Sequence, residues 1–363
     1  MTLQNKYKIA LVGYRLSGGG SDKVMANLSC FLSDIGVDVH IVTVIDEINY
    51  SYKGTVFSSR KYEKYGKILG RFTRFISLKK YFKQNEFDLI IDFRFRIKDF
   101  QEFFIANFVY NAPTYFTVHS SKLEAYIPKS KFWANKIYKQ TNCKGIIAVS
   151  KKVNDMIKTN YGFNNVTTIY NAYNQDEIEN KVNESLYLVE NYILAVGQMS
   201  NPVKQFDHLI RAFALSKIDA KLVICGEGDL QKQYKKLAKE LNVEQKVIFE
   251  GYQNNPFKYM KKAKFMVLSS AYEGFPNVLV ECLACGTPIV SYDCVSGPNE
   301  IIKHNKNGLL VENQNIEKLS EAINKLNTDE ELYQHLKSNS IESVAKFELK
   351  SVGENWINTL NLK

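Results

Sequence analysis

The chain has 363 residues, of which 45% are hydrophobic and 24% are charged, and its formal net charge is +10. This length predicts two domains of ordinary size, and the composition excludes an intrinsically disordered protein. No apolar run approaches the roughly 18 residues of a membrane-spanning helix, and the run Ile9–Val12 is too short for a signal peptide, so we expect a cytoplasmic protein.

The first elements in chain order are a strand, a glycine-rich loop and a helix. Lys8–Gly13 is apolar enough for a buried strand, and the loop Tyr14–Ser21 follows it. Asp22 begins a helix whose apolar positions recur at helical spacing, Gly36 ends it, and Asp38–Ile45 is a second strand. This β-α-β unit predicts a parallel sheet. Further strands are predicted at Phe87–Phe93, Thr114–Val118, Gly145–Val149 and Val166–Tyr170.

A second series of elements follows the polar stretch Asn174–Glu184, which we interpret as a domain linker. Strands are predicted at Tyr192–Gly197, Lys221–Cys225, Val247–Glu250, Phe265–Leu268 and Pro288–Tyr292. Helices are predicted at Gln205–Ser216, Leu230–Leu241, Phe257–Lys262, Pro276–Cys285 and Ile316–Leu326. Two successive β/α series predict two doubly wound α/β domains, with ligands beyond the carboxyl ends of the strands.

The strongest pattern in the chain lies between residues 269 and 300. Glu273 and Glu281 are separated by seven residues, and Gly274–Asn277 forms a turn in which Pro276 suits the first turn of a helix. The unpaired N–H groups of that turn suit an anion or sugar hydroxyls. Two carboxylates are also the signature of a glycoside hydrolase, so the residues alone leave that class open.

This pattern resembles the E-x7-E motif of retaining GT-B glycosyltransferases, in particular glycosyltransferase family 4. Companion motifs extend the resemblance over nearly the whole chain, at Gly19–Gly20, His119, Val196–Gly197, Lys204, residues 226–228, Gly251, Gly297–Pro298 and residues 307–311. The resemblance implies a GT-B fold of two Rossmann-like domains facing a cleft. It implies an acceptor-side domain over residues 1–175, a nucleotide-sugar-binding domain over 185–345, and a C-terminal helix within 346–363 that packs back on the first domain.

The resemblance also implies a role for each matching residue. Glu281 would bind the ribose of the donor nucleotide and Glu273 the donor sugar, with His119 near the reaction centre. Lys204 would neutralise the leaving diphosphate, so the catalytic candidates are His119, Glu273 and Lys204. The other donor-binding candidates are Gly19, Gly20, Gln198, Gly274, Phe275, Pro276 and Asn277.

One position departs from the family pattern. Gln198 stands where an arginine is usual, and a neutral amide cannot replace its charge on the diphosphate. We therefore expect Lys204 to carry more of that task, or a nearby base such as Arg15 to compensate. The sequence contains no D-x-D, so we expect a transferase without metal or cofactor, in which lysine, helix N-termini and amides stabilise the leaving group.

Two further pairs of residues allow more than one interpretation. Arg94 and Arg96 follow a predicted strand and are candidates either for an acceptor phosphate or for internal ion pairs. Cys282 and Cys285 form a C-x-x-C within an apolar helical pattern. That spacing permits a metal or redox site, but small buried core residues fit these surroundings better.

Basic residues are concentrated in the first half of the chain. The densest stretch is Arg60–Lys83, with basic residues at positions 60, 61, 64, 67, 71, 74, 79, 80 and 83. Such a stretch is either a solvated helix face or a surface for anionic membranes or nucleic acid. Because no nucleic-acid motif accompanies it, we expect an anionic membrane surface, no nucleic acid, and a peripheral location on the inner face of the cell membrane.

The expected activity is transfer of a hexose or N-acetylhexosamine from a nucleotide diphosphate sugar, UDP-linked, to a glycan or polyprenyl-diphosphate-linked acceptor. Members that the chain resembles serve capsule, O-antigen or related surface-polysaccharide synthesis. Two alternatives stay open at this stage. One is a nucleotide-sugar sensor or inactive paralogue, which Gln198 makes conceivable, and the other is a nucleotide-sugar epimerase of the same architecture.

Overall fold

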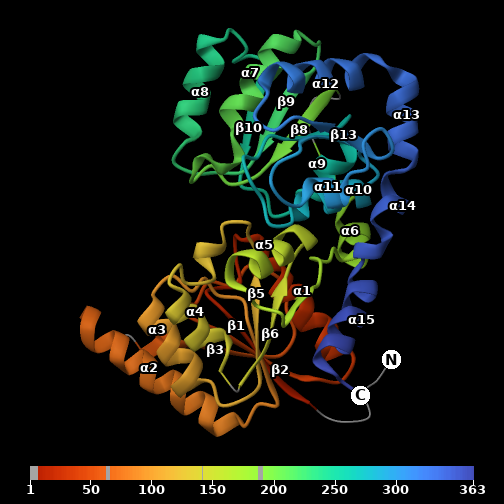
Figure 1. Ribbon diagram of the computed structural model, residues 1–363. Coiled ribbons are helices and arrows are strands. Elements are labelled where there is room, and N and C mark those ends of the chain that lie inside the picture. Colours follow the sequence, from red (N-terminus) through yellow and green to blue (C-terminus); the bar gives the residue numbers. More distant parts are fainter. Residues whose placement is uncertain (1–6, 63–65, 141, 187–190) are drawn as a thin grey trace. The chain divides into compact units, whose positions relative to one another are not determined.

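A computed structural model describes residues 7–62, 66–140, 142–186 and 191–363, without the side chains of residues 61, 62, 66–69, 71 and 72 (Figure 1). The chain divides into two compact units: unit 1 is Met1–Ala172 with Leu349–Lys363, and unit 2 is Tyr173–Glu348. Each unit contains one parallel sheet with helices packed on it. The predicted α/β class with two Rossmann-like domains is confirmed.

Unit 1 is built on a seven-stranded sheet of order β3-β2-β1-β4-β5-β6-β7, in which all pairs are parallel. The strands are β1 Lys8–Gly13, β2 Asp38–Thr43, β3 Thr55–Ser58, β4 Leu89–Asp92, β5 Thr114–Val118, β6 Cys143–Ala148 and β7 Val166–Thr168. The strand order reverses between β1 and β4. In an open parallel sheet, ligands bind beyond the carboxyl ends of the strands at such a switch point.

Helices cover both faces of this sheet. They are α1 Gly20–Asp34, α2 Gly66–Asn85, α3 Asp99–Phe104, the π-helix η2 Ile105–Val109, α4 Lys131–Tyr138, α5 Lys151–Tyr161 and α15 Leu349–Leu360, with 3-10 turns η1 Ser59–Tyr62 and η3 Leu123–Ala125. Side chains of a strand alternate between faces, so Ile9 and Leu11 join the core under α1 and α15. Ala10 and Val12 join the core under α2, α4 and α5 (Figure 1).

Unit 2 repeats the architecture with a six-stranded sheet of order β10-β9-β8-β11-β12-β13, again parallel throughout. The strands are β8 Tyr192–Val196, β9 Lys221–Cys225, β10 Val247–Gly251, β11 Met266–Leu268, β12 Ile289–Tyr292 and β13 Gly308–Val311. Here the order reverses between β8 and β11, which makes their carboxyl ends the predicted ligand edge of this unit.

The helices of unit 2 also form two groups. They are α6 Gln175–Lys181, α7 Phe206–Ser216, α8 Gln231–Glu240, α9 Phe257–Lys262, α10 Asn277–Ala284, α11 Pro298–Ile301, α12 Ile316–Thr328, α13 Glu330–Ser338 and α14 Ser340–Val344, with turns η4 Pro202–Lys204 and η5 Ala345–Phe347. One core cluster joins the sheet to α7, α8, α12 and α13. Helix α10 packs against α6, α9, α11 and α14.

The polar stretch predicted as a linker is partly helical. Residues Gln175–Lys181 form α6, which begins where the Asn174 side chain accepts a hydrogen bond from the Glu177 N–H at 3.2 Å. Ile178 is its buried residue, and the rest of the helix is largely solvated, so few apolar residues mark it in the sequence. The short strands β3 and β13 were also not predicted.

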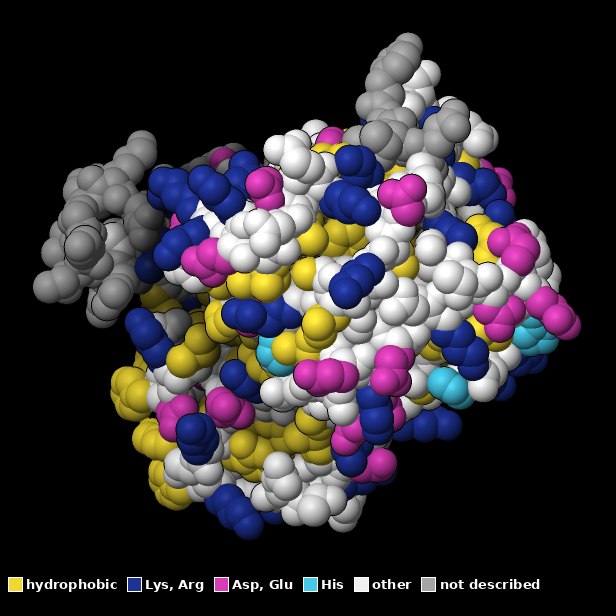
Figure 2. Space-filling model, turned by 90° about the horizontal axis from the view of Figure 1, so that it is seen from above, with side chains coloured by type: hydrophobic (Ala, Val, Ile, Leu, Met, Phe, Trp, Pro, Cys, Tyr) yellow, Lys and Arg dark blue, Asp and Glu magenta, His cyan; other side chains and the backbone are white. Residues whose placement is uncertain are grey.

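The basic stretch Arg60–Lys83 is only partly described, because Lys64 and the side chains of Lys61, Lys67 and Arg71 lie outside the described residues. In the described part of α2, Phe75 and Leu78 pack against the core, so these two apolar side chains are not free to enter a membrane. Figure 2 shows basic and acidic side chains interspersed over much of the displayed face. None of the helices in the described ranges has the length and apolar character needed to cross a bilayer.

Candidate active site

The switch point of unit 2 brings two catalytic candidates together. Lys204 follows β8 and Glu273 follows β11, and these strands are neighbours in the sheet. Lys204 Nζ donates a hydrogen bond of 2.7 Å to Glu273 Oε1, and both side chains are mostly buried. The two segments are also joined through the backbone, because Ala271 N–H donates to Val203 O at 2.8 Å and Ser269 Oγ donates to Lys204 O at 2.7 Å.

Glycines allow the loops at this edge to approach one another closely. Gly226 has φ 144° and Gly228 has φ 147°, and an added Cβ would overlap the backbone of Gly197 at the first and of Met199 at the second. Met199 N–H donates to Glu227 O at 2.7 Å, which ties the two loops together. A left-handed conformation and a missing side chain are both required here, so other residues are excluded.

The loop before α10 is held by a second contact of this kind. Gly297 has φ 100°, and an added Cβ would overlap Pro276. Ser296 Oγ donates to Gly274 O at 2.8 Å. Gly274, Phe275 and Pro276 are buried, and Asn277 begins α10 as a half-buried residue.

Helix α10 places Glu281 on its second turn, where the residue is 6% exposed. Gln198 lies just beyond the end of β8 and is exposed, so it reaches the same edge of the sheet as Lys204. Unit 2 therefore gathers Gln198, Lys204, Glu273 and the loop 274–277 along its ligand edge.

The remaining donor-binding candidates belong to unit 1. Gly19 precedes α1 and Gly20 begins it, beyond the carboxyl end of β1. Arg15 lies between two carboxylates, with Nε 3.6 Å from Asp22 and Nη1 3.0 Å from Glu47. Burial raises the pKa of Asp22 to about 6, despite Arg15 and the Gly19 N–H, both of which lower it. Asp22 was not among the site residues predicted from the sequence. Its position two residues after the glycines of this loop was the signal that could have indicated it.

His119 lies directly after β5, with its ring stacked on Phe93 at a centroid distance of 5.5 Å. Its Nε2 is 3.0 Å from Thr117 Oγ1, whose own proton goes to Asp92 O at 3.0 Å. Nε2 therefore carries the ring proton, and Nδ1 is a buried acceptor that lacks a partner within the described ranges. Burial lowers the pKa of His119 to about 3, with a smaller contribution from Arg96, so the ring is neutral.

Thr117 orients His119, and the sequence analysis did not predict this role. Residues i and i+2 of a strand lie on one face, and the spacing of Thr117 and His119 was the signal for this contact. The neutral ring with a free acceptor nitrogen suits a hydrogen bond from a sugar hydroxyl better than a role as a proton donor.

Arg94 and Arg96 are part of the interior of unit 1. Arg94 donates two hydrogen bonds to Asp92, at 3.1 Å from Nε and 2.8 Å from Nη2, and Nη2 is 3.0 Å from Glu102 Oε2. Burial would raise the pKa of Asp92, but Arg94 and Arg96 hold it below its usual value. Burial raises the pKa of Glu102, against the opposing effect of Arg94.

Arg96 is 1% exposed and is held mainly by carbonyl groups. Its Nη2 donates to Thr117 O at 2.6 Å, its Nη1 to Arg94 O at 2.8 Å, and its Nε to Tyr126 O at 3.0 Å. Of the two alternatives for these arginines, the structure shows the internal ion pairs. Both guanidinium groups are buried among these partners, and their role toward an acceptor phosphate stays a prediction.

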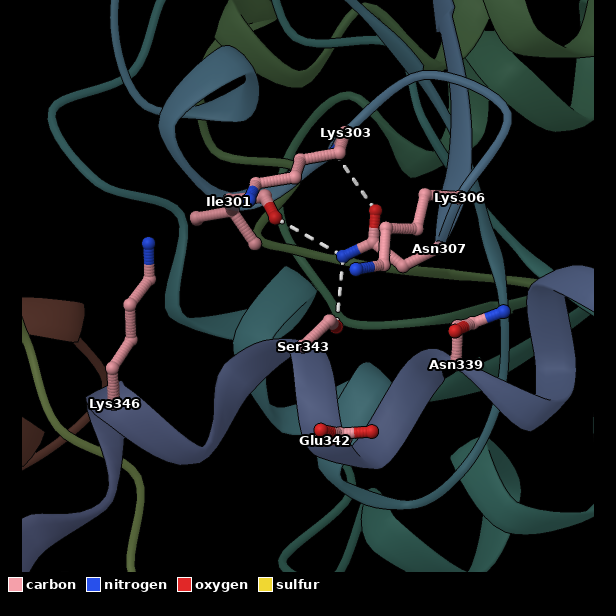
Figure 3. Close-up of a pocket in the computed structure, with 8 residues that line it drawn as sticks. All are labelled: Ile301, Lys303, Lys306, Asn307, Asn339, Glu342, Ser343 and Lys346. Carbon is pink, nitrogen blue, oxygen red and sulfur yellow. Dashed lines mark hydrogen bonds between the residues drawn. The ribbon is translucent and has the colours of Figure 1, made fainter.

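The cysteine pair and a cavity lie away from the ligand edge of unit 2. Cys282 and Cys285 are buried on and just after α10, and Cys282 Sγ contacts Thr287 O at 3.7 Å. A cavity of about 190 Å³ lies between α14 and the loop before β13 (Figure 3). Asn307 spans it, donating to Ile301 O and to Ser343 Oγ. Because this loop enters β13, the cavity is at the amino-terminal edge of the sheet, opposite to Glu273.

Comparisons with known proteins match both units. A family model described as glycosyltransferase family 4 matches residues 18–177, and one described as glycosyl transferases group 1 matches residues 176–343. The chain is 30% identical over 90% of its length to N-acetylgalactosamine-N,N'-diacetylbacillosaminyl-diphospho-undecaprenol 4-alpha-N-acetylgalactosaminyltransferase of Campylobacter jejuni, of which it covers 91%. The chain belongs to glycosyltransferase family 4.

Other similar proteins agree with this assignment. A poly(ribitol-phosphate) alpha-N-acetylglucosaminyltransferase of Staphylococcus aureus is 28% identical over 69% of this chain, which spans 51% of that protein. The crystal structure of Anabaena HepE with UDP and glucose superposes with a TM-score of 0.81 at 18% identity, covering 98% of this chain and 99% of HepE. The fold of this family 4 glycosyltransferase is therefore GT-B, as predicted, and the enzyme is a hexosyltransferase.

Proposed function

We propose that this family 4 enzyme transfers a hexose or N-acetylhexosamine from a UDP-sugar to a lipid-linked glycan in surface-polysaccharide synthesis, with retention and without a metal ion. Two similar enzymes are named as transferring N-acetylgalactosamine and N-acetylglucosamine, and HepE was crystallised with UDP. The Campylobacter jejuni enzyme is named for a substrate carried on undecaprenol diphosphate. These relatives support the donor and acceptor classes.

The observation that carries the proposal is the Lys204–Glu273 pair at the switch point of unit 2. In the structure, the Glu273 carboxylate accepts a hydrogen bond from the Lys204 ammonium group. When a donor binds, its sugar hydroxyls become donors to Glu273, and Lys204 turns to the diphosphate. A cation placed on the leaving group is worth most where charge develops in the transition state.

In the proposed reaction, the bond between the anomeric carbon and the donor phosphate oxygen breaks, and the acceptor hydroxyl oxygen forms the new bond from the same side. The acceptor proton passes to the departing phosphate oxygen, so the products are the extended glycan and UDP. Glu281 binds the ribose hydroxyls, and the Nδ1 atom of His119 accepts a hydrogen bond from the donor sugar. We assign the loop at Gly19 and Gly20, where α1 begins, to the diphosphate, because the N-terminus of a helix favours an anion.

We propose that the enzyme works as a peripheral protein on the cytoplasmic face of an anionic membrane, because an undecaprenol-linked acceptor is confined to a bilayer. The basic first half of the chain is consistent with attraction to anionic lipid. The glycan itself extends from the membrane, so the active site needs to reach only its distal sugar.

The test combines donor binding with turnover. A panel of nucleotide sugars is screened by thermal shift, because a true donor raises the melting temperature by mass action. UDP release is then measured with the stabilising donor and an undecaprenol-linked oligosaccharide. Glu281→Gln keeps the size of the side chain but removes the ionised acceptor, so both donor stabilisation and turnover should be lost.

The matched control is Glu240→Gln, which changes an exposed carboxylate on α8. It should behave as wild type in both assays. Normal turnover by Glu281→Gln would contradict the assignment of the donor site, and stabilisation by no nucleotide sugar would contradict the proposed donor class.

A further inference from the structure

A group of large apolar side chains lies on the surface of unit 1. Those at this surface with at least half of their area exposed are Ile76, Phe95, Ile97, Phe100, Phe108 and Phe132, with exposed fractions between 50% and 70%. They come from α2, from the loop between β4 and α3, and from α3, η2 and α4. We call this surface the aromatic face. In Figure 2, hydrophobic side chains lie toward the left of the displayed face, with both basic and acidic side chains near them.

Ring contacts connect the aromatic face into one surface. The half-buried Trp133 packs against Phe132 at 5.2 Å and Phe100 at 6.1 Å between ring centroids. It also contacts Phe103 at 5.6 Å, and Phe103 contacts Phe108 at 6.0 Å. Helices α3, η2 and α4 therefore share a continuous aromatic layer, and single scattered exposed residues do not account for it.

The loop after β4 is built to hold apolar side chains outward. Arg94 and Arg96 point into the unit, where their ion pairs and carbonyl contacts fix them. Phe95 is 50% exposed and Ile97 70% exposed, between and after these arginines. In an ordinary surface segment the apolar residues would be buried and the arginines solvated. Here the hydrogen bonds of the buried Arg94 and Arg96 hold the loop, so Phe95 and Ile97 stay exposed.

Lysines are the exposed charged residues of the two segments that carry most of the aromatic face. Within residues 94–108 and 129–139, the exposed charged side chains are Lys98, Lys129, Lys131, Lys136 and Lys139. The acidic residues of these segments are Glu102, which is buried, and Asp99, which is half-buried. The exposed end of α2 adds Lys79, Lys80 and Lys83.

We propose that the aromatic face of unit 1 docks on an anionic lipid bilayer, with its exposed rings in the headgroup–acyl boundary and its lysines on lipid phosphates. Phenylalanine and aliphatic side chains of interfacial segments enter that boundary, and lysines beside them add attraction to anionic lipid. A second protein chain is the less suitable occupant, since lysine is depleted in the cores of protein interfaces. The inference rests on the proposed function for the kind of partner, and it names the residues that make the contact.

The test is sedimentation with vesicles of phosphatidylcholine alone or mixed with phosphatidylglycerol. Wild type should bind the mixed vesicles, and Phe100→Gln with Phe132→Gln should lower the partition coefficient by about tenfold or more. Both side chains are largely exposed, so the change spares the core. The triple variant Lys79→Glu, Lys80→Glu and Lys83→Glu should also bind more weakly than wild type. The difference between the two should be largest at low salt, where charge attraction is least screened. The matched control is Leu215→Gln, which removes a residue 54% exposed on α7 and should leave binding unchanged.

The fluorescence of Trp133 gives a second readout, which non-specific adsorption to vesicles would not change. Mixed vesicles should shift its emission to the blue, and brominated lipids should quench it; Trp133→Phe should abolish both signals. Equal binding by the double phenylalanine variant, or no binding by wild type, overturns the inference, as does a dimer that dissociates on Phe100→Gln. The proposed function fails separately: a chain that sediments with vesicles as expected yet releases no UDP with any lipid-linked glycan contradicts that proposal alone.

Discussion

Replacing Arg94 by methionine should lower the free energy of unfolding of unit 1 by about 3–5 kcal/mol, because it removes the buried cation that is hydrogen-bonded to two buried carboxylates. Asp92 is fully buried and Glu102 is 4% exposed, and Arg94 is hydrogen-bonded to both. For a unit of this size, that loss corresponds to a fall in melting temperature of about 6–20 °C. Methionine keeps much of the arginine stem, so lost packing contributes little.

The matched control is Arg15→Met. Arg15 also lies between two carboxylates, Asp22 and Glu47, but its side chain is 35% exposed. Water screens such a pair, so the same substitution should cost no more than about 1 kcal/mol. The comparison tests the effect of exposure of the arginine, because each arginine pairs with two carboxylates.

Chemical denaturation followed by tryptophan fluorescence measures this effect. The two tryptophans, Trp133 and Trp356, both belong to unit 1, so the signal reports that unit. Arg94 holds the pKa of Asp92 below its usual value, and that stabilisation is present above about pH 4 and disappears as pH falls. The difference between wild type and Arg94→Met should therefore shrink in acid. A loss below about 1 kcal/mol at neutral pH would refute the reasoning.

Three further predictions concern the candidate site. UDP release should survive EDTA, since no D-x-D is available to hold a cation on the diphosphate, and loss of activity that Mn²⁺ restores would contradict this. Gln198→Arg should tighten donor binding, measured by thermal shift or calorimetry, because it restores a cation beside Lys204; unchanged affinity would place Gln198 away from the diphosphate. Burial lowers the pKa of His119 to about 3, so wild type should lose unfolding free energy as pH falls from about 6.5, whereas His119→Gln should lose less, and equal acid slopes would show a solvated ring.

The architecture was accessible from the sequence because parallel strands buried on both faces are continuous apolar runs. Thr114–Val118 and Lys221–Cys225 were predicted with the bounds that the structure gives. Edge strands are harder, because they are short and half-solvated. Thr55–Ser58 has one buried residue out of four, and nothing in its pattern separates it from a loop.

The sequence assigned Lys204 and Glu273 to one donor site, through the family resemblance, and it did not predict the contact between them. Their hydrogen bond depends on the strand order, which places β8 beside β11, and the linear sequence does not contain that order. The direction of Arg94 and Arg96 was undecidable for a related reason. In a segment that alternates arginine with apolar residues, either set of side chains can point into the protein. Here the arginine side chains point inward, where Arg94 pairs with Asp92 and Glu102.

The last helix of the chain completes the first unit. Helix α15 packs on α1, where Gly353 lies against the ring of Phe31 so closely that a Cβ would overlap it, and Tyr115 Oη donates to Thr359 O at 2.9 Å. On the ribosome, residues 173–348 are synthesised before Leu349–Leu360, so unit 2 has all its residues while unit 1 still lacks a helix. The usual order of co-translational folding, with the N-terminal domain first, is thereby reversed for the final step. Until α15 has been synthesised, the nascent chain exposes the apolar side of α1 that α15 later covers. We expect a chaperone to bind the nascent chain during that interval.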